Sequence, residues 1–327
     1  MMRSISFNLA VVALALALSG CSSIARGVTE AVLDNSKTVD TRQCEISGPS
    51  FTGVRQGLDD EASNAASVTK VLMVHGISSH LPGYSSRFQK KLYAELGLDI
   101  TDAEVKTITL DSSRINWGAR EPHQLGTLQI TRHTDRESKR QLVFYELTWS
   151  PITEVQKQAL LADTANNEGL PRASINMSLK EFMNSAVPDL LIYNGNGYER
   201  ITEAVAQSVC WMLGNDWASL PQGGTHSCDK WAGTTYASLK PDRHYFVTHS
   251  LGSRITIDTI HNFVMDSQRR SGDVTFRQMA PTIRDKEFSV FMMANQLPLL
   301  QLGREAPAVS NEEAAYCTAQ GRLASRR

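Results

Sequence analysis

The sequence predicts an α/β fold, in which helices cover both faces of a mostly parallel β-sheet. Short apolar runs typical of buried strands recur along the chain. Stretches with the periodicity of one-faced helices separate these runs. Strands separated by helices favour parallel pairing, since a parallel pair needs a long crossover connection. The expected core strands are 71–74, 143–147, 245–247 and 290–293.

The composition is that of a globular protein with a sizeable core. The chain has 327 residues, of which 41% are hydrophobic, and this is enough for one large domain or two small ones. Its formal net charge is −1, which gives no basis for nucleic-acid binding. We therefore expect no nucleic-acid partner, and no pattern in the sequence predicts a cofactor.

Residues 1–20 are predicted to be a signal segment rather than part of the fold. Arg3 supplies a positive charge, and residues 9–18 form an apolar run too short to span a bilayer. The run ends in Leu18-Ser19-Gly20-Cys21, which resembles the lipobox of bacterial lipoproteins. The resemblance implies that Cys21 is lipidated and becomes the mature N-terminus. The alternative is an ordinary secretory signal followed by a chance cysteine.

Lipidation of Cys21 implies a protein anchored in the bacterial cell envelope. In enterobacteria an Asp after the lipidated Cys favours retention in the inner membrane. Ser22 stands there instead, which favours the outer membrane with the domain facing the periplasm. Residues 21–67, poor in apolar clusters, are expected to form a tether with at most one short helix or strand. The folded domain is expected at 68–303, followed by a tail at 304–327.

The domain is expected to begin with a buried strand at 68–74 that runs into His75-Gly76. A helix is predicted at 84–96, and an alternating strand at 105–110. Two further strands, 125–131 and 141–148, are expected to flank an exposed hairpin loop in which His133 is solvated. Helical stretches follow at 152–163, 178–187 and 198–213, with a flexible loop predicted at 188–197.

The strand at 245–247 leads directly into Thr248-His249-Ser250-Leu251-Gly252 and then into a helical pattern. This order matches the G-x-S-x-G nucleophile elbow, with Thr in place of the first Gly. Such a turn holds the serine clear of the sheet edge, and the backbone N–H of Leu251 would point at a developing oxyanion. The alternative is an ordinary strand-to-helix turn.

Together, the His-Gly stretch and the serine turn resemble the α/β-hydrolase family. The resemblance implies that Ser250 is the nucleophile and that an N–H near Gly76 and Ile77 is the second oxyanion donor. It also implies a structural role for His75. The helical region at about 152–240 would then be an insertion that caps the active site. The predicted activity is hydrolysis of a small-molecule or lipid ester.

The histidines depart from the family pattern, in which an acid and then a His follow the nucleophilic Ser. Only His261 follows Ser250, and it lies eleven residues along the same predicted helix, roughly 16 Å away along the axis. The strands that carry the acid and the His are therefore expected to be missing, as in a truncated or degenerate member. The base is unassigned, with His80 and His226 as weak candidates on loops.

Two functions stay open. The first is a lipid-anchored serine esterase or lipase with an incomplete triad, for which we expect weak or absent turnover. The second is a non-catalytic envelope lipoprotein that uses a degenerate hydrolase fold for binding.

Four cysteines besides Cys21 can form disulfides in an exported protein, and they allow three connectivities. Cys210 and Cys228 bracket a loop rich in Gly, Pro and Asn, so they are the favoured local pair. No metal site is expected, because the sequence has no paired CxxC or HxxxH spacing.

Overall fold

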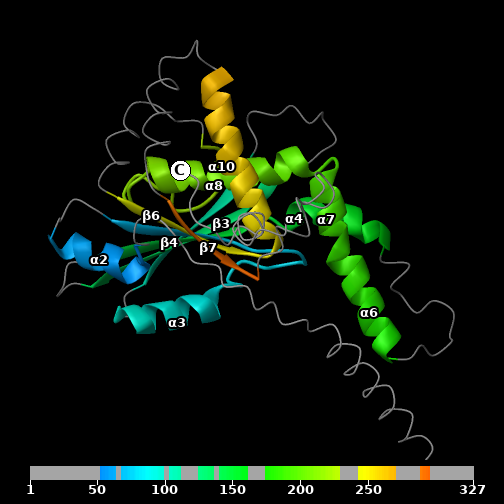
Figure 1. Ribbon diagram of the computed structural model, residues 1–327, viewed down its shortest axis with the longest axis horizontal. Helices are drawn as coiled ribbons and strands as arrows, with labels where there is room; N and C mark the ends of the chain where they lie inside the picture. Colours follow the sequence, from blue (N-terminus) through cyan, green and yellow to red (C-terminus); the bar gives the residue numbers. More distant parts are fainter. Residues whose placement is uncertain are drawn as a thin grey trace, which may run out of the picture.

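The computed structural model describes residues 52–63, 68–98, 103–111, 124–135, 140–160, 174–228, 242–269 and 288–294. In this part of the chain seven strands form one sheet in the order β5-β2-β3-β4-β1-β6-β7 (Figure 1). The strands are β1 (Thr69–Val74), β2 (Glu104–Asp111), β3 (Gln124–Asp135), β4 (Arg140–Thr148), β5 (Thr225–His226), β6 (Arg243–His249) and β7 (Ser289–Met293).

The sheet is mixed, with a parallel half that contains all four predicted core strands. β4, β1, β6 and β7 pair in parallel with one another in that order. β3 is antiparallel to both of its neighbours, β2 and β4, while β5 pairs in parallel with β2. The predicted α/β class with a mostly parallel sheet is thus confirmed.

Helices cover both faces of the sheet. On one face lie α8 (Tyr198–Gly214) and α10 (Leu251–Arg269); on the other lie α2 (Val54–Ser63) and α3 (Ser86–Leu96) (Figure 1). Every residue of β1 is buried, as expected for a strand covered on both faces. Because side chains alternate along a strand, Leu72 and Val74 join the core under α8 and α10, whereas Val71 and Met73 join the core with α2 and α3.

Helix α2 lies within the range expected to be a tether, yet it packs on the sheet. Leu58 is fully buried in the same core as Val71 and Tyr245. Gly57 lies so close to the Tyr245 ring that an added Cβ would be 2.3 Å from the Tyr245 hydroxyl oxygen. Residues upstream of Val68 therefore contribute to the folded core.

Two local predictions are wrong. The expected exposed loop after residue 131 is instead a continuation of β3, which pairs with β4 as far as Asp135 and Arg140. His133 in this extension is buried and packs on the ring of Tyr93, with ring centroids 3.9 Å apart. The loop expected at 188–197 contains helix α7 (Val187–Asn194), because a Pro is well tolerated in the first turn of a helix.

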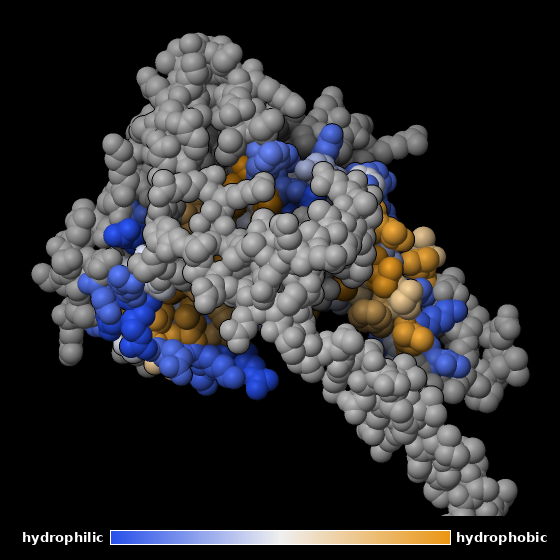
Figure 2. All heavy atoms as spheres, viewed as in Figure 1, coloured by the Kyte–Doolittle hydropathy of each residue, from blue (hydrophilic) through white to orange (hydrophobic). Residues whose placement is uncertain are grey.

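The helices between β4 and β6 divide into two groups. α8 packs directly on the sheet, with buried side chains such as Val205 in the core. By contrast, α4 (Pro151–Lys157), the short 3₁₀ helix η1 (Gln158–Leu160), α6 (Ser174–Ser185) and α7 lie beyond the sheet edge (Figure 1). α6 projects away from the sheet, and Figure 2 shows apolar side chains gathered there. Exposed large apolar side chains on these helices are Val155, Met177, Leu179, Phe182, Met183 and Leu191.

A disulfide joins Cys210 of α8 to Cys228, which follows β5. This is the local pair that the sequence favours. Cys21, Cys44 and Cys317 lie outside the described residues. No helix in the described part of the chain combines the length and the apolar character needed to cross a membrane.

Candidate active site

Ser250 occupies the one-residue junction between β6 and α10. Its φ of 50° is in the left-handed region, which is uncommon for a residue other than Gly. The Ser250 N–H donates to the carbonyl oxygen of Met293 at the end of β7, at 2.9 Å. Ser250 is half-buried, whereas Thr248 before it and Leu251 after it are fully buried. The serine therefore stands at the C-terminal edge of the sheet on a sharp turn.

Two glycines allow this turn to approach the neighbouring strand β1. An added Cβ on Gly76 would lie 2.9 Å from the Ser250 Cβ and 3.2 Å from the His249 Nδ1. An added Cβ on Gly252 would lie 2.5 Å from the carbonyl oxygens of Val74 and His75. The turn after β6 and the loop after β1 are therefore in direct contact, and a larger side chain at either Gly would separate them.

The backbone groups expected to bind an oxyanion lie at this contact. Leu251 is the first residue of α10, so its N–H has no acceptor within the helix and lies at the positive end of the helix dipole. Gly76, which lies just after β1, packs against Ser250, and Ile77 is the next residue along the loop. The start of α10 and the loop after β1 thus meet at Ser250.

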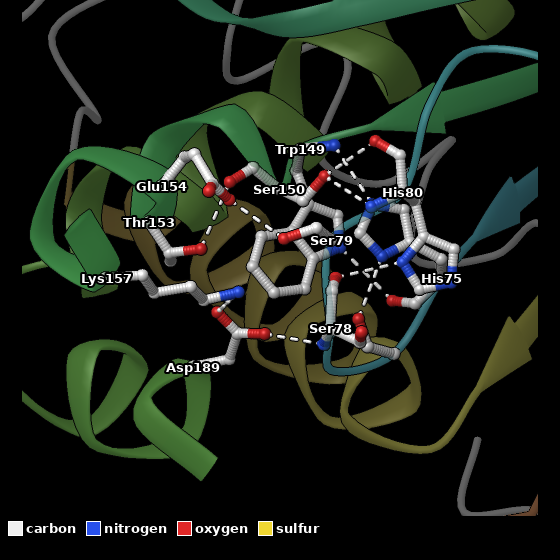
Figure 3. Close-up of polar contacts among 11 residues, drawn as sticks. His75, Ser78, Ser79, His80, Trp149, Ser150, Thr153, Glu154, Lys157 and Asp189 are labelled. Carbon is white, nitrogen blue, oxygen red and sulfur yellow. Dashed lines mark hydrogen bonds and ion pairs between the residues drawn. The ribbon is translucent and has the colours of Figure 1, made fainter. Parts of the chain in front are cut away.

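His75 is held as a neutral ring inside the structure (Figure 3). Its Nδ1 lies 2.8 Å from the carbonyl oxygen of Gly76, and its Nε2 accepts from the backbone N–H of Trp149, with the two nitrogens 3.2 Å apart. The His75 ring stacks on Trp149 and His80, with centroid distances of 4.7 and 4.1 Å. Burial lowers the pKa of His75 well below its usual range, and the neighbouring His80 lowers it further. Both ring nitrogens are used, so His75 has no nitrogen left to act as a base.

His80 lies a few residues further along the same loop. Its Nδ1 is 2.9 Å from the carbonyl oxygen of Ser78. A carbonyl oxygen can only accept, so Nδ1 carries the proton and Nε2 of the neutral ring is an unprotonated acceptor. The hydroxyl of Ser150 holds the backbone in place, because it accepts from the His80 N–H and donates to the His80 carbonyl oxygen, both at 3.0 Å.

Apart from His249, which adjoins Ser250 in the chain, the other described histidines lie away from the serine. His226 is in β5 at the far edge of the sheet, five strand spacings from β6, or roughly 24 Å. The prediction of His226 as a candidate base is corrected by this distance from β6. His261 is exposed on α10, and His244 is buried near the opposite end of β6. His249 precedes Ser250 and is exposed.

A buried ion pair supports the loop and was not anticipated from the sequence. Asp189 of α7 accepts the N–H of Ser78 at its Oδ2, at 2.6 Å, and its Oδ1 lies 2.7 Å from the Nζ of Lys157 at the end of α4. Pro188-Asp189 before an apolar run is a helix-start signal, and it could have located α7. The contact of Asp189 with a loop 111 residues away has no signal in the sequence.

Comparisons with family models, with curated proteins and with solved structures found no match to this chain. Among the described residues, no group of three or more His, Cys, Asp or Glu side chains is placed to hold a metal ion.

Proposed function

We propose that this protein is a serine hydrolase of the esterase type, with Ser250 as the nucleophile. The observation that carries the proposal is the left-handed backbone of Ser250, at the junction of a parallel strand and a helix. A non-Gly residue in this conformation is strained, and strain of this kind gathers at functional sites. An ordinary strand-to-helix turn would not need it. The contact between Ser250 and the His-Gly loop supports an α/β-hydrolase arrangement of the site.

In the proposed reaction, the Ser250 hydroxyl oxygen attacks the carbonyl carbon of an ester. The carbonyl oxygen becomes an oxyanion, which accepts hydrogen bonds from the N–H groups of Leu251 and Ile77. The proton of Ser250 passes to a base and then to the leaving alcohol, giving an acyl-enzyme that water hydrolyses. The backbone donors of the loop and the helix are fixed before the substrate arrives.

We assign the base to His80 in this proposal. Its loop follows β1, the strand beside β6, whereas His226 lies at the far edge of the sheet. The bond from Nδ1–H to Ser78 leaves Nε2 able to take a proton. Among the described residues, a backbone carbonyl and not an acidic side chain orients this ring. We therefore expect slower turnover than a complete triad gives.

A second candidate function is binding without catalysis. In the described residues, both ring nitrogens of His75 and one ring nitrogen each of His80 and His226 bond to backbone groups, and none of these rings bonds to Ser250. A serine without a base is a weak nucleophile at neutral pH. In this alternative, the protein is an envelope lipoprotein that uses the site to hold a ligand. In both cases we propose attachment to the membrane through lipidated Cys21.

The deciding experiment compares the wild type with Ser250→Ala, and uses Ser178→Ala on exposed α6 as the matched control. The readouts are labelling by a fluorophosphonate and turnover of a short-chain activated ester. We expect slow turnover that falls at least about a thousandfold in Ser250→Ala and is unchanged in Ser178→Ala. If the wild type shows no labelling and no turnover, that result favours the binding function.

A further inference from the structure

The loop after β1 contains a second residue with a left-handed backbone. Ser78 has a φ of 87°, and it follows directly after the proposed oxyanion donor Ile77. A residue other than Gly keeps such a conformation only when its surroundings hold it there. The contacts of this loop therefore indicate what fixes the donor.

Three consecutive residues of the loop are held by the helices beyond the sheet edge (Figure 3). The Ser78 N–H donates to Asp189 of α7, the Ser79 hydroxyl donates to Glu154 of α4 at 2.8 Å, and the His80 N–H donates to the Ser150 hydroxyl. The first of these contacts is unusual because its acceptor is charged and has no exposed surface. Lys157, which is 5% exposed, offsets the cost of burying that charge.

Ile77 thus lies between two fixed points. On one side, Gly76 packs against Ser250, where no room exists for even a Cβ. On the other side, the peptide group shared by Ile77 and Ser78 is fixed by the short bond from the Ser78 N–H to Asp189. Because the residue before Ile77 and the peptide group after it are both held, the direction of the Ile77 N–H is held as well.

We propose that Asp189, neutralised by Lys157, is a positioning residue that aims the Ile77 N–H at the oxyanion formed on Ser250. This inference rests on the proposed hydrolase function. Lys157 has a second role, since an unpaired carboxylate so close to the site would repel the oxyanion. The helical insertion is then a support for the oxyanion loop, built from α4 and α7.

The chain offers a matched control at the other end of β1. Lys70 and Asp242 also form a buried ion pair, with Nζ and Oδ2 2.7 Å apart, and Asp242 also accepts a backbone N–H, that of Val68. Both pairs join a buried Lys to a buried Asp, but only the Asp189 pair contacts the loop beside Ser250. Asp242→Ala reports the effect of losing such a pair on stability alone.

The experiment measures the rate of fluorophosphonate labelling at Ser250, the kcat and KM for a short-chain ester, and the Tm. At assay temperatures well below the Tm of the variant, we expect Asp189→Ala to slow labelling and to lower kcat by about 10- to 100-fold. The change in KM should be smaller. Asp242→Ala should lower the Tm but label at the wild-type rate. Asp189→Asn combined with Lys157→Met keeps an acceptor for the Ser78 N–H without any charge, and it should recover most of the rate.

Equal labelling rates in Asp189→Ala and Asp242→Ala would overturn the positioning role while leaving the hydrolase function intact. If Asp189→Ala does not fold, the double variant decides: wild-type-like kcat supports the role, and a kcat reduced 10-fold or more overturns it. A wild-type protein that neither labels nor turns over ester would reject the hydrolase function, and the inference with it.

Discussion

Backbone strain in the described part of the chain is concentrated beyond the C-terminal ends of the parallel strands. Among the described residues, three other than Gly have a positive φ: Ser78, Ser250 and Ala294. They follow the C-terminal ends of β1, β6 and β7, which are adjacent parallel strands. A fold gains nothing from strain at three neighbouring strand ends unless those ends must present particular groups. This coincidence strengthens the choice of this edge as the functional one.

The strain at Ser250 leads to the first residue-scale prediction. Gly adopts a positive φ without a steric penalty, so Ser250→Gly should be more stable than Ser250→Ala by about 1 kcal/mol in free energy of unfolding. Denaturant unfolding of the two variants provides the comparison. Gly97 has a φ of 68°, and an added Cβ there would meet only the Arg140 Nη2 at an ordinary contact distance of 4.0 Å, so Gly97→Ala should show a loss of similar size. Equal stabilities of Ser250→Gly and Ser250→Ala would mean that the turn is not strained.

The second residue-scale prediction concerns the pH dependence of stability. The folded protein lowers the pKa of His75, so the unfolded chain binds that proton more tightly. The contribution of the neutral His75 ring to the free energy of unfolding is fully present above about pH 6.5. It is lost as the pH falls below that value, by up to about 1.4 kcal/mol per pH unit. Urea unfolding between about pH 5.5 and 7 would measure this slope. His75→Gln should flatten it, whereas His261→Gln, at an exposed position, should leave it unchanged.

At the scale of elements, apolar runs located the strands of the parallel half of the sheet. β1, β4, β6 and β7 were all predicted this way. The end of β3 was missed because Arg132, His133 and Asp135 are polar. Their contacts explain why they are tolerated in a strand: His133 packs on Tyr93, and Asp135 pairs with Arg140 at 2.8 Å. Such partners come from distant parts of the chain or across a hairpin, and polarity alone does not reveal them.

The attachment of α3 to the sheet leads to an element-scale prediction. Glu146 of β4 is 1% exposed, and it accepts the N–H groups of Gly83 and Ser85 and the Ser85 hydroxyl. Glu146→Ala would leave these buried donors without an acceptor, so we expect a loss of about 3 kcal/mol in free energy of unfolding. Glu146→Gln keeps an acceptor and should lose less. Glu95→Ala on the exposed face of α3 is the control, and a Glu146→Ala variant as stable as it would contradict this role.

At the scale of the whole molecule, the site depends on strand order, which local patterns do not encode. The motifs identified Ser250 and Gly76 separately, 174 positions apart in the sequence. Their contact requires β1 and β6 to be neighbours in the sheet. The same strand order places His226 at the opposite edge, although its loop position made it a plausible base from the sequence. Asp189 entered the site only because α7 packs beside the loop after β1.

The whole-molecule prediction concerns attachment to the membrane. Cys21 lies outside the described residues, and the case for its lipidation rests on the sequence Leu18-Ser19-Gly20-Cys21 after an apolar run. Two or three acyl chains are enough for stable attachment, because each buried CH₂ contributes about 0.8 kcal/mol. We expect the wild type in the membrane fraction, with an intact mass that includes the acyl groups.

Cys21→Ser should abolish that attachment, since serine offers no thiol for acylation. The variant should either be released or keep its leader, and its mass should lack the acyl groups. Ser22→Ala is the control, because it leaves Leu18-Ser19-Gly20-Cys21 intact and should be lipidated like the wild type. A Cys21→Ser protein with the wild-type mass and the wild-type membrane partition would reject the anchor. Loss of the anchor should leave labelling of Ser250 unchanged, since the sheet edge that holds Ser250 is formed by residues downstream of Val68.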